Sequence, residues 1–304
     1  MNTKRRVRTW IRKCSVLTPS MRMILLSFDT EEFDLPREHG VEVDTQTSMM
    51  VSRYGTERIL DILKNNNVLA TFFISGKFAE LAPDIVKRIM NEGHEVACHG
   101  LDHFQPSKTD FKASKKIVES IAGVKTFGYR QPRMFPVSEK EIKEAGYLYN
   151  SSLNPTFIPG RYMNLNTPRS CFMKDGVLQI PASVTPLIRF PLFWLSNHVL
   201  PRKLYYWMIK RTLKHDGYFN TYMHPWEFFE LKEHPEWKTQ SIILMNSGRK
   251  LQLRLDLLIK ELKKTGIPFS TYREFAKIKL EKLSNRGRGM CNNLSFASDS
   301  GGRL

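Results

Sequence analysis

LLSFDTEEFD, residues 25–34, is the stretch that decides the fold and locates its chemistry. An apolar run over residues 23–26 passes almost directly into four carboxylates: Asp29, Glu31, Glu32 and Asp34. The run predicts a buried strand over 23–28, and like charges crowded at the end of a strand repel one another. Either these side chains are solvated or a positive group lies among them.

Strand-like and helix-like segments alternate after this first strand. Strands are predicted at 68–76, 94–100, 124–129, 147–150, 218–223 and 268–272, and helices at 51–66, 82–93, 107–122, 138–145 and 241–265, with a last helix starting at 273. This alternation predicts βαβ units and a parallel sheet. About seven strands in roughly 260 residues favour a closed or nearly closed α/β barrel over an open sheet.

The barrel is expected to occupy residues 21–280 as a single domain. Residues 150–217 are rich in proline and aromatic side chains, and we expect them to form an irregular insertion or lid. Residues 1–20 contain six lysines and arginines and no acid, whereas residues 281–304 are rich in Ser, Asn, Gly and Arg. We interpret the first segment as a basic tail and the last as a disordered tail.

The formal net charge of +17 is concentrated at the two ends of the chain. These ends are either solvated tails or segments attracted to an anionic surface. Nothing between them resembles a nucleic-acid-binding module, so membrane contact is the preferred interpretation. The four cysteines form no CxxC pair, which fits a reducing compartment. Because we expect no signal peptide and no spanning helix, a cytoplasmic protein is predicted, with peripheral contact at the inner face of the membrane as an option.

Residues capable of chemistry follow four of the predicted strands. They are Asp29 and Glu31 after the first strand, His99 and His103 after the strand at 94–100, Arg130 after 124–129 and His224 after 218–223. In a parallel α/β barrel the carboxyl ends of the strands share one face, where active sites are built. The sequence therefore predicts one site at that face.

The segment HGLDH, residues 99–103, can direct two imidazoles toward one point. With one carboxylate they would form an open zinc site with room for a water; otherwise they are ordinary loop histidines. A dication here would remove the repulsion among the acids. Asp29 and Glu31 would point the same way on a strand, so we expect Asp29 to be the base and Glu31 a metal ligand. Glu32 and Asp34 are interpreted as solvated acids, although the choice between Glu31 and Glu32 stays open.

Three further residues have an expected role at this face. His224 can act as a general acid across the site from Asp29; the alternative is a core histidine. Arg130 can bind a carboxylate with two hydrogen bonds and so orient Asp29; the alternative is a surface arginine. Trp226 is interpreted as a packing residue or as a wall that stacks on a sugar, and Glu227 as an acid that could tune His224.

The segments SFDTEEFD, HGLDH, YRQP and YMHPWEF, in this order, resemble the motifs of the NodB-homology polysaccharide deacetylases, carbohydrate esterase family 4. They are closer to the branch of peptidoglycan-deacetylase and allantoinase-like proteins. The resemblance spans about residues 23–275. It implies a distorted, TIM-like (β/α)7-type barrel and a divalent metal, with zinc as the expected ion.

The resemblance also implies roles for individual residues. By position, Asp29 matches the base, Arg130 the arginine that holds it and His224 the acid, while the metal ligands match Glu31, His99 and His103. Pro132, Arg133 and Trp226 are expected to contact substrate, with a backbone N–H near Arg133 as the oxyanion donor. The chain departs from the family pattern in three places. Asp-Thr-Glu replaces an adjacent acid pair, and Gly100 replaces a serine or threonine between the histidines. The family's usual fourth motif is not evident, and LQIPASVTP, residues 178–186, occupies its place as a candidate lining of the pocket.

The predicted function is removal of an N-acyl (acetyl) group from an amino sugar in a polysaccharide or cell-envelope glycan precursor. The metal would polarise the amide and acidify a water, and Asp29 and His224 would move protons. Three alternatives remain: deformylation or deacetylation of a lipid-linked sugar, hydrolysis of a cyclic amide, and an inactive glycan-binding barrel. The segment 188–210, apolar and aromatic but interrupted by proline and charge, is either a lid or an interfacial element that docks on membrane.

Overall fold

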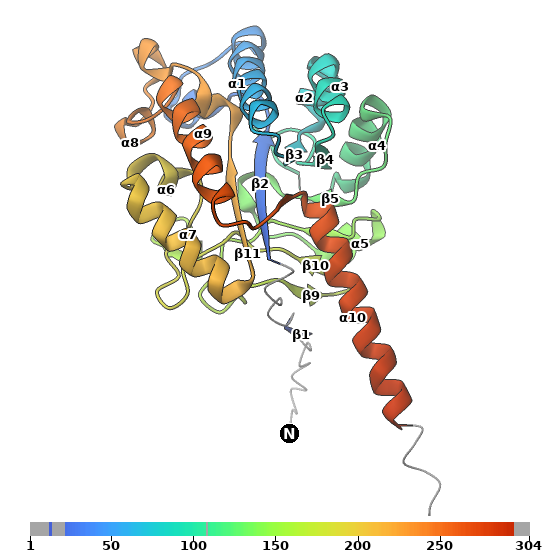
Figure 1. Ribbon diagram of the computed structural model, residues 1–304. Helices are drawn as coiled ribbons and strands as arrows, with labels where there is room; N and C mark the ends of the chain where they lie inside the picture. The colour runs from blue at the N-terminus through green and yellow to red at the C-terminus, as the bar shows by residue number, and fades with distance from the viewer. Residues whose placement is uncertain (1–11, 14–21, 108, 295–304) are drawn as a thin grey trace, which may run out of the picture.

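A curled, mostly parallel sheet forms the centre of the protein, with helices packed around its outside (Figure 1). The computed structural model describes residues 12–13, 22–107 and 109–294. The strands of the main sheet follow the order β1-β9-β10-β6-β5-β4-β3-β2-β11, and β12 also pairs with β2. The predicted distorted barrel, with its alternating βα connections, is confirmed.

The strands are short apart from two. They are β1 (Arg12–Lys13), β2 (Met23–Thr30), β3 (Thr71–Ile74), β4 (Glu95–Cys98), β5 (Gly128–Tyr129), β6 (Tyr149–Asn150), β7 (Phe157–Ile158), β8 (Tyr162–Met163), β9 (Phe172–Lys174), β10 (Val177–Gln179), β11 (Tyr218–Met223) and β12 (Phe269–Ser270). The helices are α1 (Thr45–Asn65), α2 (Gly76–Leu81), α3 (Pro83–Asn91), α4 (Phe111–Ala122), α5 (Glu139–Glu144), α6 (Trp194–Val199), α7 (Arg202–Asp216), α8 (Ser241–Leu244), α9 (Arg249–Lys263) and α10 (Tyr272–Leu294).

Strand β2 is the axis of the sheet. From Ile24 to Thr30 every residue of the strand is buried, as expected for a parallel strand covered on both faces. Its Phe28 pairs with Phe72 of β3 on one side and with Met223 of β11 on the other. The carboxyl ends of these three neighbouring strands therefore lie together, and the acidic segment that follows β2 begins there.

Strand β11 is the last strand in the order of the main sheet. Side-chain hydrogen bonds connect it to the segment that follows β10. Asn220 of β11 accepts a hydrogen bond from the backbone N–H of Ser183 through Oδ1 at 2.6 Å, and its Nδ2 donates to Pro181 O at 2.8 Å. The Ser183 hydroxyl in turn accepts from the Asn220 N–H at 3.0 Å. A buried asparagine thus supplies the donor and acceptor that a neighbouring strand would supply in a regular barrel.

The region predicted as an irregular insertion, 150–217, is partly barrel wall. It contains β10, which pairs in parallel with β6, and the 15-residue helix α7, which directly precedes β11 in the chain. The remainder of the region forms the β7–β8 hairpin, strand β9 and the short helix α6. The expected irregular insertion therefore does not include β10 and α7, which are regular elements of the barrel.

Both predicted tails and one helix also differ from expectation. Arg12–Lys13 pair with β9, and α10, which begins in the barrel, continues to Leu294 and leads away from the body of the molecule (Figure 1). Residues 1–11, 14–21 and 295–304 lie outside the described residues. The helix predicted at 241–265 is divided into α8 and α9, because Gly248 adopts φ +67°. Across the described ranges, no helix is both long and apolar enough to cross a membrane.

Candidate metal and catalytic site

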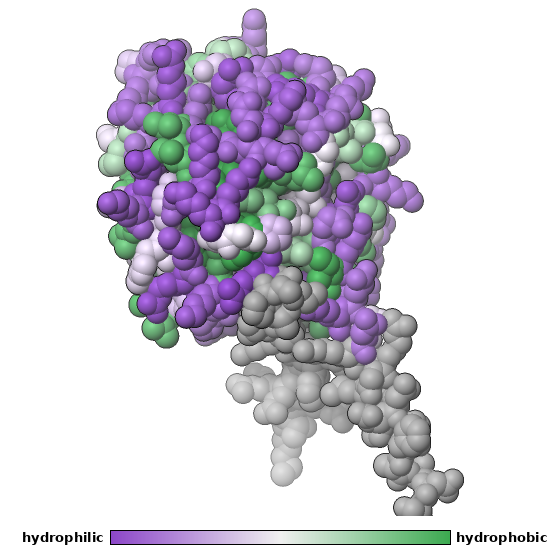
Figure 2. All heavy atoms as spheres, in the orientation of Figure 1, coloured by the Kyte–Doolittle hydropathy of each residue, from purple (hydrophilic) through white to green (hydrophobic). Residues whose placement is uncertain are grey.

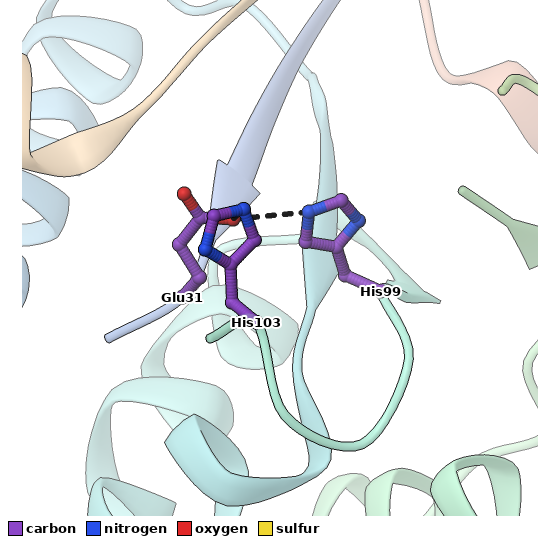
Figure 3. Close-up of side chains that lie close together, drawn as sticks. All are labelled: Glu31, His99 and His103. Carbon is purple, nitrogen blue, oxygen red and sulfur yellow. Dashed lines mark hydrogen bonds and ion pairs between the residues drawn. The ribbon is translucent and has the colours of Figure 1, made fainter. Parts of the chain in front are cut away.

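Three predicted ligands converge at the carboxyl ends of β2 and β4 (Figure 3). Ligand atoms of Glu31, His99 and His103 all lie within 4.8 Å of one another, and all three residues are more than half buried. Glu31 Oε2 is 3.0 Å from His99 Nε2 and 3.2 Å from His103 Nε2. Figure 3 shows the three side chains facing one another, with Glu31 after the end of β2 and both histidines on the segment after β4.

The far nitrogen of each histidine is held by another group. His99 Nδ1 is 2.9 Å from the carbonyl oxygen of Arg130, and His103 Nδ1 is 2.8 Å from Asp34 Oδ2. Such contacts fix the ring so that Nε2 faces the site. Asp34, expected to be a solvated acid, is instead a buried partner of His103.

The structure separates the two adjacent glutamates. Glu32 turns away from the histidines and accepts a hydrogen bond from Ser75 Oγ at 2.7 Å, with Lys77 Nζ at 3.7 Å. Glu31 faces His99 and His103. The geometry therefore places Glu31, not Glu32, within the cluster.

The donor set fits a divalent metal such as zinc. Two imidazole nitrogens and one carboxylate oxygen converge, which is a common ligand set for an open zinc site. Burial opposes a charge on His103, but Glu31 and Asp34 outweigh it and raise the pKa of His103 to about 9. The carboxylates of Glu31 and Asp34 thus favour a positive charge at His103. The same carboxylates would stabilise a metal cation bound there.

Asp29 and Arg130 form a buried ion pair beside this cluster. Arg130 is 1% exposed, so it is not a surface arginine. Its Nη1 donates to Asp29 Oδ1, while Nε donates to Ser151 O at 3.1 Å, and its guanidinium carbon lies 3.9 Å from the centre of the Phe73 ring. Burial alone would raise the pKa of Asp29, but Arg130, His99 and His224 bring that pKa below its usual range, so the carboxylate is ionised.

His224 faces Asp29 from the end of β11. Its Nε2 is 4.0 Å from Asp29 Oδ2, and its Nδ1 is 2.8 Å from Glu227 Oε1. The second oxygen of Glu227 is 2.7 Å from Nε2 of His198, and both residues are fully buried. Burial lowers the pKa of His224, but the hydrogen bond to Glu227 and the nearby carboxylates raise it above its usual value overall.

These groups line a cavity of about 260 Å³ with a largely apolar wall. Trp226 stacks on His224 with ring centres 5.0 Å apart and donates from Nε1 to Glu31 Oε1 at 3.4 Å. Arg133 also lines the cavity; its side chain pairs with Asp34 and Glu38, and its backbone has φ +57°. Other lining residues include Ile158, Arg161, Tyr162, Phe193, Trp194, Tyr222 and Ile243.

Pro132, expected to contact substrate, is instead buried beside Gly100 and is not a lining residue of this cavity. A Cβ on Gly100 would lie 2.9 Å from Pro132 Cγ, and the backbone there has φ +69°. Both observations explain why glycine stands where a serine or threonine was expected. Sequence reasoning missed Asp34 and His198 as partners of the site.

The fold and site together define an α/β barrel with a two-histidine, one-carboxylate group at the carboxyl ends of its strands. Residues 18–146 match the family model described as Polysaccharide deacetylase. The resemblance to that family inferred from the four motifs is thereby confirmed, over the part of the chain that contains the acidic segment, both site histidines and Arg130.

Curated relatives match shorter segments. The chain is 56% identical over 48 residues to a peptidoglycan-N-acetylglucosamine deacetylase from Bacillus cereus, covering 16% of this chain and 18% of the relative. It is 33% identical over 104 residues to a peptidoglycan-N-acetylmuramic acid deacetylase from Bacillus subtilis, covering 30% of this chain and 39% of the relative. The chain thus spans well under half the length of these relatives.

Solved structures share the fold over most of the chain. One assigned as a polysaccharide deacetylase from Mycobacterium smegmatis has a TM-score of 0.58 at 19% identity, covering 90% of this chain and 96% of the other. A second, from Pseudomonas aeruginosa PAO1, has a TM-score of 0.57 at 14% identity, covering 86% and 92%. At these identities the match supports the barrel itself.

Proposed function

We propose that this protein is a metal-dependent hydrolase that removes an N-acyl group, such as acetyl, from an amino sugar of a cell-envelope glycan. The observation that carries the proposal is the position of two ionisable groups, Asp29 and His224, that face each other beside the Glu31–His99–His103 cluster in one cavity. The deacetylase relatives and the family match favour an N-acyl amino sugar as the substrate. The assignment of the substrate to a cell-envelope glycan and the requirement for a metal are both parts of this proposal.

The residues of the chain supply proton transfer on both sides of the substrate. Asp29 is ionised and has one oxygen fixed by Arg130, so its other oxygen, Oδ2, can take a proton from an attacking water. His224, with its raised pKa, carries a proton that it can give to the leaving amine. A divalent ion held by Glu31, His99 and His103 would polarise the acyl carbonyl and acidify a water when bound.

The first test is release of free amine from a panel of N-acetyl and N-formyl amino sugars, with and without a chelator. We expect release from at least one N-acetyl sugar, loss of activity after chelation and recovery after zinc is restored. Amine release that survives chelation would contradict the metal dependence. If the protein hydrolysed a small cyclic amide but released amine from no amino sugar of the panel, the proposed substrate class would be contradicted.

The second test is Asp29→Asn. It removes the base but none of the three predicted ligands, so kcat should fall by about 10²–10⁴-fold while the bound metal, measured by elemental analysis, stays at the wild-type level. Glu32→Gln is the matched control, because Glu32 faces Ser75 rather than the cavity; its kcat should stay near wild type. Retained turnover in the Asp29 variant would refute its role as base.

A further inference from the structure

An exposed apolar surface lies on α7 and the loop that precedes α6; we call it the Trp207 patch. Its most exposed members are Leu187 at 93%, Ile188 at 77% and Trp207 at 52%, with Leu204 at 39%. The first three, with neighbouring side chains, border a shallow groove of about 240 Å³. Such side chains gain free energy when they leave water, so a cluster of them calls for a partner.

Helical geometry sets Trp207 opposite the core. The buried face of α7 consists of Tyr205, Ile209, Thr212 and Leu213. At 100° per residue, Trp207 lies on the far side of the helix from Tyr205. Arg211 and Lys214 follow Trp207 by four and seven residues, so they share its outward face, and Arg211 lies over the Trp207 ring at 5.0 Å.

The loop that presents Leu187 and Ile188 is anchored. The side chain of the next residue, Arg189, donates to Thr167 O at 2.7 Å and to Pro155 O at 3.3 Å. Its carbonyl accepts from Thr156 Oγ1 at 2.7 Å. These hydrogen bonds of Arg189 fix the loop to neighbouring segments. The exposed side chains of Leu187 and Ile188 therefore extend from a loop that is held in place.

The segment of sequence that contains the patch carries charge of one sign. From residue 176 to 215 the sequence contains no Asp or Glu but six Lys and Arg: Arg189, Arg202, Lys203, Lys210, Arg211 and Lys214. Of these, Lys210 faces Glu261 of α9 at 3.5 Å. Figure 2 shows hydrophobic atoms beside hydrophilic ones at the lower left of this face, where Figure 1 places α7. Aliphatic and indole side chains surrounded by basic ones match the headgroup region of an anionic bilayer.

We propose that the Trp207 patch docks the protein on the surface of a membrane that contains anionic phospholipid. Leu187 and Ile188 would enter the acyl boundary, Trp207 would lie at the headgroup level, and Arg211 and Lys214 would contact lipid phosphates. A second copy of the chain is a poorer partner, because a symmetric contact between two such patches would bring like charges together. The proposal does not depend on the enzymatic function.

The segment that follows the anchored loop reaches the candidate site. Phe193 and Trp194, a few residues after the anchored loop, line the catalytic cavity. The β7–β8 hairpin connects the two places as well: Thr156, just before it, bonds to Arg189, and Ile158 and Tyr162 within it line the cavity. The loop that presents Leu187 and Ile188 is therefore connected to the wall of the cavity through this hairpin and through the residues that follow it.

Sedimentation with vesicles tests the proposal on the full chain at physiological salt. Wild type should bind vesicles that contain phosphatidylglycerol and bind pure phosphatidylcholine at least about tenfold more weakly, because the basic side chains respond to surface charge. Leu187→Ser combined with Ile188→Ser should weaken binding to the anionic vesicles by about tenfold or more. Arg211→Gln with Lys214→Gln should weaken it to a similar extent.

The matched control is Leu253→Ser, an exposed leucine on α9 at 58%, which should bind like wild type. The basic residues at the two ends of the chain can also attract anionic vesicles, so the comparison between variants is decisive. Equal binding by wild type and the Leu187/Ile188 double variant would overturn the proposal. So would absence of wild-type binding, or self-association that disappears in the double variant without any vesicle binding.

Discussion

Glu227 connects two histidines of the candidate site, and each of its carboxylate oxygens contacts one of them. Oε1 accepts from the His224 backbone N–H and contacts Nδ1 of the same ring, while Oε2 contacts His198. His198 and His224 in turn lower the pKa of Glu227 against the effect of burial, so it stays ionised. The negative charge next to Nδ1 favours the imidazolium form of His224, which is the form that a general acid requires.

Glu227→Gln should therefore impair the acid step. Without the negative charge the pKa of His224 falls, so less imidazolium is present at neutral pH. We expect kcat/KM to drop about 10–100-fold at pH 7 and the alkaline limb of its pH profile to move to lower pH. Glu236→Gln is the control, because it removes the acid of an exposed His–Glu pair, His234 with Glu236 at 2.9 Å. An unchanged alkaline limb would contradict this role of Glu227.

At the scale of single residues, the sequence was informative where type and spacing limit the chemistry. The grouping of Glu31 with His99 and His103, and of Asp29 with Arg130, could be predicted because each follows a strand whose end faces the site. Their roles in catalysis stay predictions. The contact of His198 with Glu227 could not be predicted, because it depends on how α6 packs against the end of β11, and no local pattern encodes that.

Gly55 links helix α1 to the segment that follows β11. It is buried within α1, and a Cβ at this position would lie 1.8 Å from the carbonyl oxygen of Pro225. Ala is normally preferred over Gly inside a helix by about 1 kcal/mol. Here the helix approaches the backbone next to His224 so closely that the extra carbon has no space.

Gly55→Ala should thus destabilise the protein, although alanine has a higher helix propensity than glycine. We expect the free energy of unfolding to fall by about 2 kcal/mol or more, and activity to fall with it because Pro225 adjoins His224. Chemical denaturation gives the first quantity and amine release the second. Met50→Ala, at an exposed position of the same helix, should change stability by less than about 0.5 kcal/mol. A neutral or stabilising Gly55→Ala would show that the two backbones can separate at little cost.

Elements were predictable from sequence to the extent that they carry local signals. The strand at 218–223 has the predicted bounds, and α3 begins at Pro83 and ends shortly before Gly93. The short strand β10 was hidden, because its three residues lie in an aromatic and proline-rich region and are defined by pairing with β6. The break at Gly248 was also missed, since apolar spacing alone continued across it.

On the scale of the whole molecule, the barrel brings polar groups from distant segments into the interior. The alternation of strands and helices in the sequence was sufficient to predict the architecture. It did not predict how the last strand of the barrel is connected to the segment after β10. Asn220 performs that task through hydrogen bonds to Ser183 and Pro181, which lie about 40 residues away in the chain. The stability of such an interior depends on the protonation of its buried groups.

His94 makes this dependence measurable. It is 4% exposed, it accepts the Ala70 N–H through Nδ1 at 3.3 Å, and burial lowers its pKa from 6.5 to about 4. In the unfolded chain the ring gains a proton as pH falls through 6.5, whereas in the folded protein it stays neutral down to about pH 4. The contribution of neutral His94 is therefore complete above pH 6.5 and is lost between pH 6.5 and 4, by about 3 kcal/mol.

The measurement is the free energy of unfolding, from denaturant titrations at steps between pH 7 and pH 4. His94→Asn keeps an acceptor for Ala70 but cannot be protonated, so its stability should fall less steeply over this range than that of wild type. Its stability at pH 7 should be lower, because the ring no longer packs on Phe72, whose centre is 5.3 Å away. His215→Asn, at a largely exposed side chain, should retain the wild-type slope. Parallel curves for wild type and His94→Asn would mean that His94 is protonated in the folded protein at the same pH as in the unfolded chain.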